Sequence, residues 1–352
     1  MNLYNDLERK IETAQTALAD HLYKADNENL EKVEILNVNK RAFSTIIQLR
    51  VRTSRVTKRF VMKAVNHHPI NKDVTDRENQ AVVEYNILRN LYTRFQKIEK
   101  CSVPRPILVI PEIEAYVMEF IEGHILLDDH RYTRYLSSQD GFDKLRKAYF
   151  YSGKWLRHFQ EFTGIRTSDS NSLIEVINKC DHRLRLIEDS HDPRCPKRLR
   201  SRIMDFLNKE LKKLSGENIL ISGRHGDFSP INIMTGTDGI TVIDFLGYKE
   251  EPLPIDLLKI LVFLEDERMS LTCSKRRVES LGKSFLEGYG EIPHIPVPVL
   301  VICEAMQRIV SLWGNISASG RHFHHYQERN FRVKAHVTWL INERKRRLLW
   351  PS

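Results

Sequence analysis

One short segment of the sequence gathers an unusual number of polar side chains that could do chemistry. It spans residues 224–245 and contains Asp227, Asn232 and Asp244. A carboxylate and an amide oxygen are ligands that Mg²⁺ accepts, with phosphate oxygens and water completing its octahedron. A second carboxylate nearby can accept the proton of a hydroxyl nucleophile. The residue types therefore indicate metal-assisted chemistry on a phosphate.

The spacing of these residues predicts that they meet. Asp238-Gly239 lies between two apolar runs and predicts a hairpin turn. With the turn centred near residue 238, Asn232 and Asp244 are equidistant from it and are expected opposite each other, with Cβ atoms about 4.5–5.5 Å apart. Asp227 precedes Asn232 in a loop that Ser229-Pro230 should hold extended. Each of the three could alone be an ordinary turn or capping residue, but together they favour a functional site.

The elements that must position these residues follow from hydrophobic periodicity. A helix is expected at 2–24, strands at 33–36, 45–51 and 59–65, a helix at 75–92, and strands at 107–110 and 115–120. Gly123 marks a break, and the rest reads as mostly helical apart from a hairpin near 231–245. This order predicts an α+β fold with two lobes. The expected divisions are a helical extension at 1–32, a strand-rich N-lobe at 33–122 and a larger helical C-lobe at 123–352, which includes the hairpin at 224–245.

The composition limits the class of protein. The chain has 352 residues, a net charge of +9 and 41% hydrophobic residues, which fits a globular protein with a large core. No apolar run approaches the roughly 18–20 residues of a membrane span, and the N-terminus resembles no signal peptide. Five scattered cysteines without a Cys-x-x-Cys pair favour reduced thiols. The expected location is therefore the cytoplasm, with contact at the inner face of the membrane left open.

The polar segment also carries a resemblance. His225-x-Asp227-x-x-x-x-Asn232, followed by Ile243-Asp244-Phe245, resembles the catalytic and metal-binding loops of the protein-kinase-like fold. With glycine in its second position, the first motif is similar to that of the aminoglycoside phosphotransferase and choline kinase family. The resemblance implies ATP or GTP and Mg²⁺ as cofactors, Asp227 as catalytic base, and Asn232 and Asp244 as Mg²⁺ ligands. It also implies structural support from His225 and Asp256.

A kinase needs a cation for the nucleotide phosphates on an N-lobe strand, and Lys63 fits. Strand alternation puts it on an apolar face, where a lysine is costly unless it is paired. Glu84, on the edge of the apolar stripe of the next helix, is the expected partner. Glu78 is assigned instead to a capping box with Thr75. The alternative is a lysine that reaches solvent from an edge strand.

The rest of the nucleotide site is implied by the resemblance. Glu119 and Ile121 stand in the expected lobe connector, whose backbone would meet the adenine edge. The expected phosphate-covering loop at 37–45 has no glycine, which departs from the usual pattern, and Ser44 could serve there.

The expected acceptor is the hydroxyl of a small molecule: a sugar, an amino alcohol or a lipid-linked glycan. An aminoglycoside is disfavoured by the net charge, and the walls of the acceptor pocket are expected at 304–308 and 313–326.

Two alternative functions stay open. One is a protein kinase, although no Ala-Pro-Glu follows Asp244, and the other is a catalytically silent nucleotide-binding module. No motif indicates specific nucleic-acid binding. The basic segment at 342–350, with Leu and Trp, could contact a membrane or simply end a helix. The sequence leaves the oligomeric state open.

Overall fold

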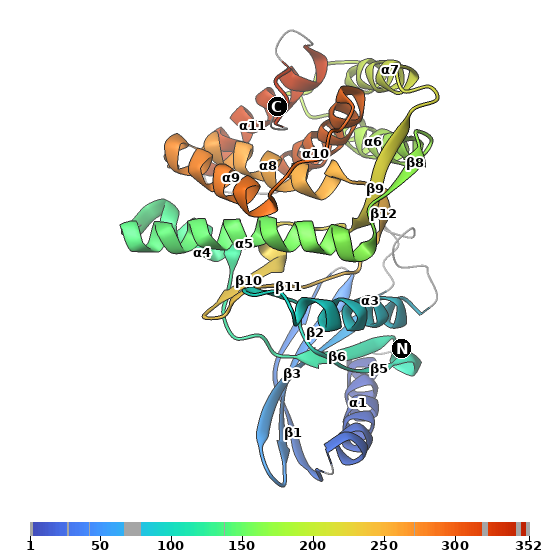
Figure 1. Cartoon of the computed structure of the whole chain (residues 1–352), viewed down its shortest axis with the longest axis vertical. Helices are drawn as coiled ribbons and strands as arrows, with labels where there is room; N and C mark the ends of the chain where they lie inside the picture. The colour runs from blue at the N-terminus through green and yellow to red at the C-terminus, as the bar shows by residue number, and fades with distance from the viewer. Residues whose placement is uncertain are drawn as a thin grey trace. The chain divides into compact units, whose positions relative to one another are not determined.

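The computed structural model describes residues 3–26, 28–41, 43–66, 79–136, 138–270, 272–318, 323–342 and 346–349. It divides into two compact units (Figure 1). Unit 1 contains Met1–Gly123 and Gly236–Gly247, and unit 2 contains His124–Thr235 and Tyr248–Ser352. The first break lies one residue beyond the expected boundary at 122/123. The hairpin at 224–245, expected whole in the C-lobe, is divided, because the chain returns to unit 1 at Gly236.

Unit 1 is built on an antiparallel sheet of five strands in the order β1-β2-β3-β6-β5. The expected strands are all present, and the helices precede and interrupt them. The elements are α1 (Leu3–Asp26), β1 (Leu30–Lys40), β2 (Ser44–Thr53), β3 (Thr57–Val65), α3 (Gln80–Phe95), β4 (Cys101–Ser102), β5 (Pro106–Ile110), η2 (Pro111–Ile113), β6 (Ala115–Glu119) and β11 (Gly239–Val242).

The two faces of this sheet carry different chemistry, because neighbouring side chains of a strand point to opposite sides. On one face, Met62 and Val117 join an apolar core with Leu18 of α1. On the other face, Lys63 stands opposite Tyr116 in the register of β3 and β6 and faces α3. One face of the sheet thus packs into the apolar core, and the other face carries a charged site.

Three local expectations in unit 1 need correction or qualification. The helix expected as a separate extension at 1–32 belongs to the core of unit 1, since Leu18 is completely buried there. The loop expected at 37–45 is mostly strand, and only residues 41–43 connect β1 to β2. The capping box of Thr75 and Glu78 lies outside the described residues.

The glycine of the expected turn is required by its position. Gly239 begins β11, which pairs in parallel with β4, and its φ is +117°. A Cβ atom on Gly239 would lie 2.2 Å from the carbonyl oxygen of Lys100. Only glycine therefore allows the chain to enter β11 beside β4.

Unit 2 is mostly helical, as expected. Its elements are β7 (His124–Ile125), α4 (Leu126–Leu136), α5 (Gln139–Thr163), β8 (Arg166–Asp169), α6 (Ser172–Asp189), α7 (Leu199–Lys212), β9 (Asn218–Arg224), η3 (Pro230–Asn232), β10 (Ile233–Gly236), β12 (Lys249–Pro252), α8 (Pro254–Arg268), α9 (Lys275–Tyr289), α10 (Val297–Ser317) and α11 (Phe323–Ile341). A three-stranded antiparallel sheet, β12-β9-β8, was not expected. Its outer strands are short and polar, so they lack the alternation that marks a strand.

Helix α5 supports the candidate catalytic loop and is itself held by α9. Gly153 of α5 and Gly288 of α9 each face the backbone of the other helix. A Cβ atom would come within 1.9 Å of the Phe285 oxygen at the first and 1.8 Å of the Phe150 oxygen at the second. The paired glycines let the two helices approach closely, which fixes the face of α5 that packs on the loop.

The most apolar helix is α10. It is long and apolar enough to span a membrane by length and composition, with a mean hydropathy of 1.4 in its most apolar window. This corrects the expectation that no segment approaches a span. However, 67% of this window is buried inside the unit. A helix in the core of a globular unit has the same length and apolar composition.

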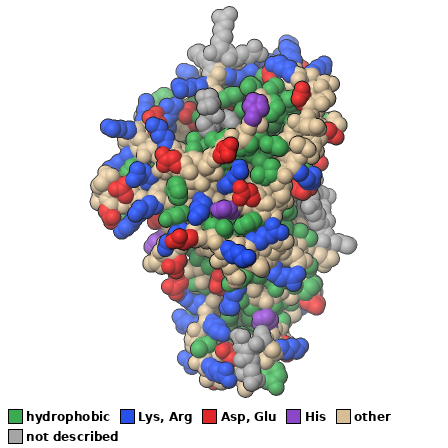
Figure 2. All heavy atoms as spheres, viewed as in Figure 1, with side chains coloured by type: hydrophobic (Ala, Val, Ile, Leu, Met, Phe, Trp, Pro, Cys, Tyr) green, Lys and Arg blue, Asp and Glu red, His purple; other side chains and the backbone are tan. Residues whose placement is uncertain are grey.

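The positive net charge does not gather into one patch on the face drawn in Figure 2. Lys and Arg side chains there are intermingled with Asp and Glu. Among the described residues of that face, the basic side chains therefore form no broad surface of the kind that nucleic acid prefers.

Candidate active site

The charged face of unit 1 holds the expected ion pair. The Nζ atom of Lys63 lies 2.6 Å from Oε1 of Glu84 and 2.7 Å from Oδ1 of Asp244. Lys63 and Glu84 are almost completely buried, whereas the Asp244 side chain is 27% exposed. A lysine ammonium has three N–H donors, and these contacts use two. The third can serve an anion that reaches the site from the side of Asp244.

Glu84 also fixes the backbone on which Asp244 stands. Its Oε1 accepts a hydrogen bond from the Phe245 amide at 2.9 Å, and Gln80 Nε2 donates to the Leu246 oxygen at 3.2 Å. Asp244 itself has a φ of +71°, a left-handed conformation that is unfavourable for a residue other than glycine. Helix α3 thus holds Asp244 in a strained turn with its carboxylate on Lys63.

The electrostatics of the group follow from burial and close contact. Burial alone would lower the pKa of Lys63, but the carboxylates of Asp244 and Glu84 outweigh it, and that pKa lies above its ordinary value. Burial raises the pKa of Glu84. The ammonium of Lys63 opposes this rise, and the nearby carboxylate of Asp244 adds to it. Burial and the same two carboxylates raise the pKa of Tyr116 well above its usual range. Lys63 therefore stays charged, as a phosphate-binding cation must.

The other nucleotide candidates of unit 1 lie on or beside the sheet. Glu119 ends β6, and its Oε1 accepts a hydrogen bond from the Arg105 amide at 2.6 Å. Within the described part of the chain, the amide of Ile121 has no backbone partner, which suits a connector that meets a ligand. Ser44 begins β2 with a buried side chain. The nucleotide contacts of all three stay predictions.

In unit 2, a chain of contacts holds the candidate catalytic loop. Asp256, buried at the start of α8, accepts a hydrogen bond from the His225 amide at 2.6 Å. His225 Nδ1 in turn accepts from the Asp227 amide at 3.3 Å. The His225 ring packs edge-on against Trp155 and Phe228. His225 and Asp256 thus contact the loop in a way that agrees with the supporting role that the resemblance implies for them.

Burial and backbone conformation fit the same arrangement. Burial raises the pKa of the Asp256 carboxyl, although the nearby Arg224 opposes this. Gly226 has a φ of +93°, so the glycine of the motif occupies a turn that other residues rarely adopt. Ser229 is extended before Pro230, as predicted.

Asp227 and Asn232 are in direct contact. Asn232 Nδ2 donates to the Asp227 carbonyl at 3.0 Å and to its Oδ2 at 2.9 Å. The donor side of the amide is thereby turned toward Asp227, which leaves Oδ1 as the oxygen that could bind a cation. The amide oxygen of Asn232 and the partly exposed carboxylate of Asp244 are hard ligands of the type that Mg²⁺ accepts. Asn232 and Asp244 belong to different units, and their expected proximity stays a prediction.

Lys259 is a residue that the sequence analysis missed. It stands on α8 three positions after Asp256, and its Nζ forms a close ion pair with Oδ1 of Asp227. Residues three apart share a helix face. If Asp256 contacts the loop of Asp227, then Lys259, on the same face of the helix, is expected to lie near that loop as well. This spacing is the sequence signal by which Lys259 could have been found. Both oxygens of the candidate base therefore have partners.

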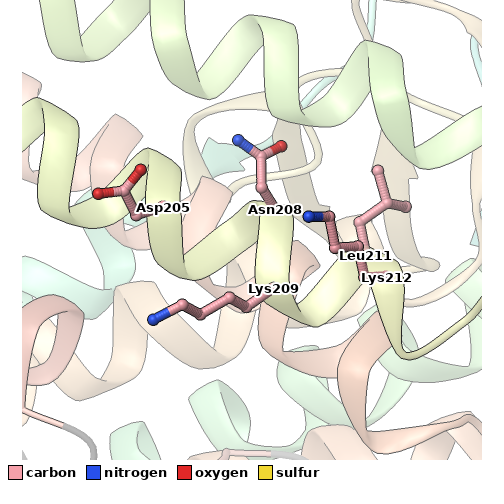
Figure 3. A pocket seen from close by; sticks show the side chains of 5 residues that line it. All are labelled: Asp205, Asn208, Lys209, Leu211 and Lys212. Atoms are coloured by element: carbon pink, nitrogen blue, oxygen red, sulfur yellow. The ribbon is translucent and has the colours of Figure 1, made fainter.

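The expected acceptor wall at 304–308 is largely core. Glu304 and Arg308 are buried and form an ion pair of 2.8 Å within α10. A surface hollow of about 470 Å³ lies elsewhere in unit 2 and is lined by side chains of α7 alone (Figure 3). The side chains that line it do not converge on one point, and the place of the acceptor stays a prediction.

Comparison with known proteins establishes the fold. No family model matches the chain, and no curated protein matches its sequence. A glucosamine kinase in complex with glucosamine, ADP and inorganic phosphate is similar in structure, with 13% identity over 89% of this chain and 82% of that one, and a TM-score of 0.57. A thermostable mutant of aminoglycoside phosphotransferase APH(4)-Ia has 9% identity over 94% and 100% of the two chains, at 0.50. Choline kinase LicA from Streptococcus pneumoniae has 14% identity over 92% and 99%, at 0.49.

The first two structures confirm the expected α+β fold, which this chain shares with a glucosamine kinase and an aminoglycoside phosphotransferase. At such low identities they show the fold alone.

The buried ion pair yields a stability prediction. Lys63→Met leaves Glu84 buried beside Asp244 without a cation, and should lower the free energy of unfolding by about 3–5 kcal/mol. The double variant Lys63→Met/Glu84→Leu removes both buried charges and should lose less than Lys63→Met alone. Urea unfolding measures both values, and Lys40→Met, at an exposed position of β1 in the same sheet, is the control. A double variant that is no more stable than Lys63→Met would contradict the coupling.

Proposed function

We propose that this chain transfers the γ-phosphate of ATP to a hydroxyl group of a small molecule, with Mg²⁺ as cofactor. The observation that carries the proposal is the contact of Lys63 with both Glu84 and Asp244. These residues come from three distant segments, and the kinase pattern requires them together. The similarity of the fold to a glucosamine kinase and an aminoglycoside phosphotransferase supports the same conclusion.

Each residue has a distinct part in the proposed reaction. Lys63 would bind the nucleotide phosphates, and Glu84 would keep its ammonium in place. Asp244 and Asn232 would hold Mg²⁺, which when bound neutralises charge on the phosphates. Asp227 would orient the acceptor hydroxyl and take its proton as the phosphate is transferred. His225 and Asp256 would keep the loop of Asp227 in position.

The proposed acceptors are a sugar, an amino alcohol or a lipid-linked glycan, in that order. The glucosamine bound to a protein of the same fold favours the sugar. The net charge of +9 disfavours a polycationic aminoglycoside. GTP is kept as an alternative phosphate donor.

Membrane contact through residues 342–350 is a further part of the proposal that needs its own test. The described part of this segment has partners within unit 2. Arg346 lies over the ring of Phe206 and donates to the Trp339 oxygen, and the Leu349 amide donates to Glu304. These contacts favour the alternative that the segment closes a helix end.

The function is tested by a phosphotransfer screen with Asp227→Ala as the blank. The wild-type protein with Mg²⁺ and ATP should phosphorylate a member of a panel of sugars, amino alcohols, aminoglycosides and lipid-linked glycans, detected by mass spectrometry. Asp227→Ala should lose about 10²–10⁴-fold in turnover, because it lacks the general base. Its affinity for ATP should change little, which also serves as the control for folding.

Normal turnover in Asp227→Ala would contradict the assigned base. Transfer to protein substrates alone would favour a protein kinase, and nucleotide binding without any transfer would favour a silent module.

Lys259 gives a separate prediction for the same assay. We expect it to act through Asp227, as a positioning residue. Lys259→Met should lower kcat by about 10²-fold, since small displacements of a reacting group are this costly, while KM for ATP stays nearly unchanged. Lys259→Arg, which keeps the charge, should restore most of kcat, and the exposed Lys283→Met is the control. An unchanged kcat in Lys259→Met would contradict this role.

A further inference from the structure

A second cluster of reactive side chains lies in unit 2, apart from the residues assigned above. His130 of α4, Glu267 of α8 and Cys273, which precedes α9, bring their ligand atoms within 4.8 Å of one another. His130 and Glu267 are buried, and Cys273 is partly buried. An imidazole, a carboxylate and a thiol are the three side-chain types that bind zinc.

The distances within the cluster fit a tetrahedral ion. His130 Nε2 lies 3.3 Å from Glu267 Oε2, and Cys273 Sγ lies 3.8 Å from the same oxygen. With metal bonds of about 2.0 Å to nitrogen or oxygen and 2.3 Å to sulfur, ligands at a tetrahedral angle are separated by about 3.3–3.6 Å. These two separations are close to those that a tetrahedral ion requires, and all three ligand atoms lie within 4.8 Å of one another.

Outer partners already orient two of the three ligands. His130 Nδ1 lies 3.1 Å from the hydroxyl of Tyr149, which leaves Nε2 directed at the cluster. Arg332 donates to Oε1 of Glu267 at 3.0 Å, so Oε2 is the oxygen that faces the histidine and the thiol. Metal-binding histidines commonly have such a partner on their second ring nitrogen, which fixes the tautomer.

The cluster borders a pocket. A cavity of about 150 Å³ is lined by residues of α4, α5 and α9 and of the segment before α9, and His130 and Cys273 are among them. Three protein ligands leave one tetrahedral position unfilled. A water molecule or a small ligand in the pocket could take that position, as in zinc sites that keep an open coordination position.

We propose that His130, Glu267 and Cys273 bind one Zn²⁺ or a similar transition-metal ion, with its fourth coordination position open to this pocket. The thiol disfavours Mg²⁺ and Ca²⁺, which prefer oxygen ligands. Binding replaces the thiol proton of Cys273, which passes to solvent, and forms one metal–sulfur bond. The site is separate from the proposed Mg²⁺ ligands and does not depend on the phosphotransferase activity.

The alternative is a metal-free ion network, because Arg332 and His130 could by themselves balance Glu267. Cobalt distinguishes the two, since Co²⁺ bound to a thiolate gives a charge-transfer absorption that an ion network cannot give. Tag-free full-length protein, stripped with a chelator and dialysed, would be titrated with Co²⁺ and then with Zn²⁺. We expect one equivalent of Co²⁺ per chain to produce the thiolate band, and Zn²⁺ to displace it.

Variants assign the band to the cluster. Cys273→Ser and His130→Gln should abolish the band or weaken binding severely, whereas Cys195→Ser, which removes another partly buried thiol of unit 2, should leave it intact. Tyr149→Phe keeps all three ligands and should weaken metal affinity about 10–100-fold, as loss of an outer partner does. Circular dichroism reports whether each variant folds. If a ligand variant does not fold, Tyr149→Phe provides the test of the site. A wild-type protein without the band, or a band unchanged in folded Cys273→Ser, would overturn the proposal. If Cys273→Ser does not fold, an unchanged metal affinity in Tyr149→Phe would overturn it.

Discussion

The burial of one ammonium group between two carboxylates organises unit 1. Lys63 on an interior strand is stable only because Glu84 and Asp244 are within 2.6–2.7 Å of its Nζ. The pairing ties α3 to the sheet, and the second bond of Glu84, to the Phe245 amide, ties the turn at residues 244–246 to α3. If the lysine were absent, the buried carboxylate of Glu84 would lie near the partly exposed carboxylate of Asp244 without a cation between them. Lys63, the residue that would bind the phosphates, thus also holds α3 and the turn at residues 244–246 against the sheet of unit 1.

In unit 2, neutral and charged hydrogen bonds hold the candidate catalytic loop in position. A buried carboxylate, Asp256, holds the backbone of His225, and His225 holds the backbone of Asp227. The carboxylate of Asp227 is then shared between Asn232 and Lys259. Each reactive group in the two units is fixed by contacts inside its own unit. Such preorganisation lowers the cost of assembling a catalytic site when a substrate binds.

The sequence predicted what depends on local pattern. Strand alternation put Lys63 on an interior face, where only a partner such as Glu84 could make it tolerable, and the structure contains that pair. The hairpin glycine, the extended Ser229 and the five strands of the main sheet of unit 1 were likewise predictable from local conformational rules. The polar strands β8 and β12 were not, because their pairing with β9 is decided by tertiary contacts.

Contacts between residues far apart in the chain could not be predicted from the sequence either. Lys259 reaches Asp227 because Asp256 anchors α8 to the loop, and its spacing from Asp256 gains meaning only once that anchor is known. His130, Glu267 and Cys273 form no motif of fixed spacing, so their meeting depends on how α4 and α8 pack. The burial of Glu304 and Arg308, expected in a pocket wall, likewise follows from the packing of α10 in the core.

The central claim is that the Lys63–Glu84–Asp244 group receives a nucleotide with Mg²⁺. Calorimetric titration of ATP, with and without Mg²⁺, into the wild-type protein and Asp244→Ala tests it most directly. The account predicts that Mg²⁺ strengthens ATP binding to the wild-type protein and has little effect on the variant, which lacks a proposed ligand. Equal strengthening in both proteins, or no ATP binding to the wild type, would contradict it.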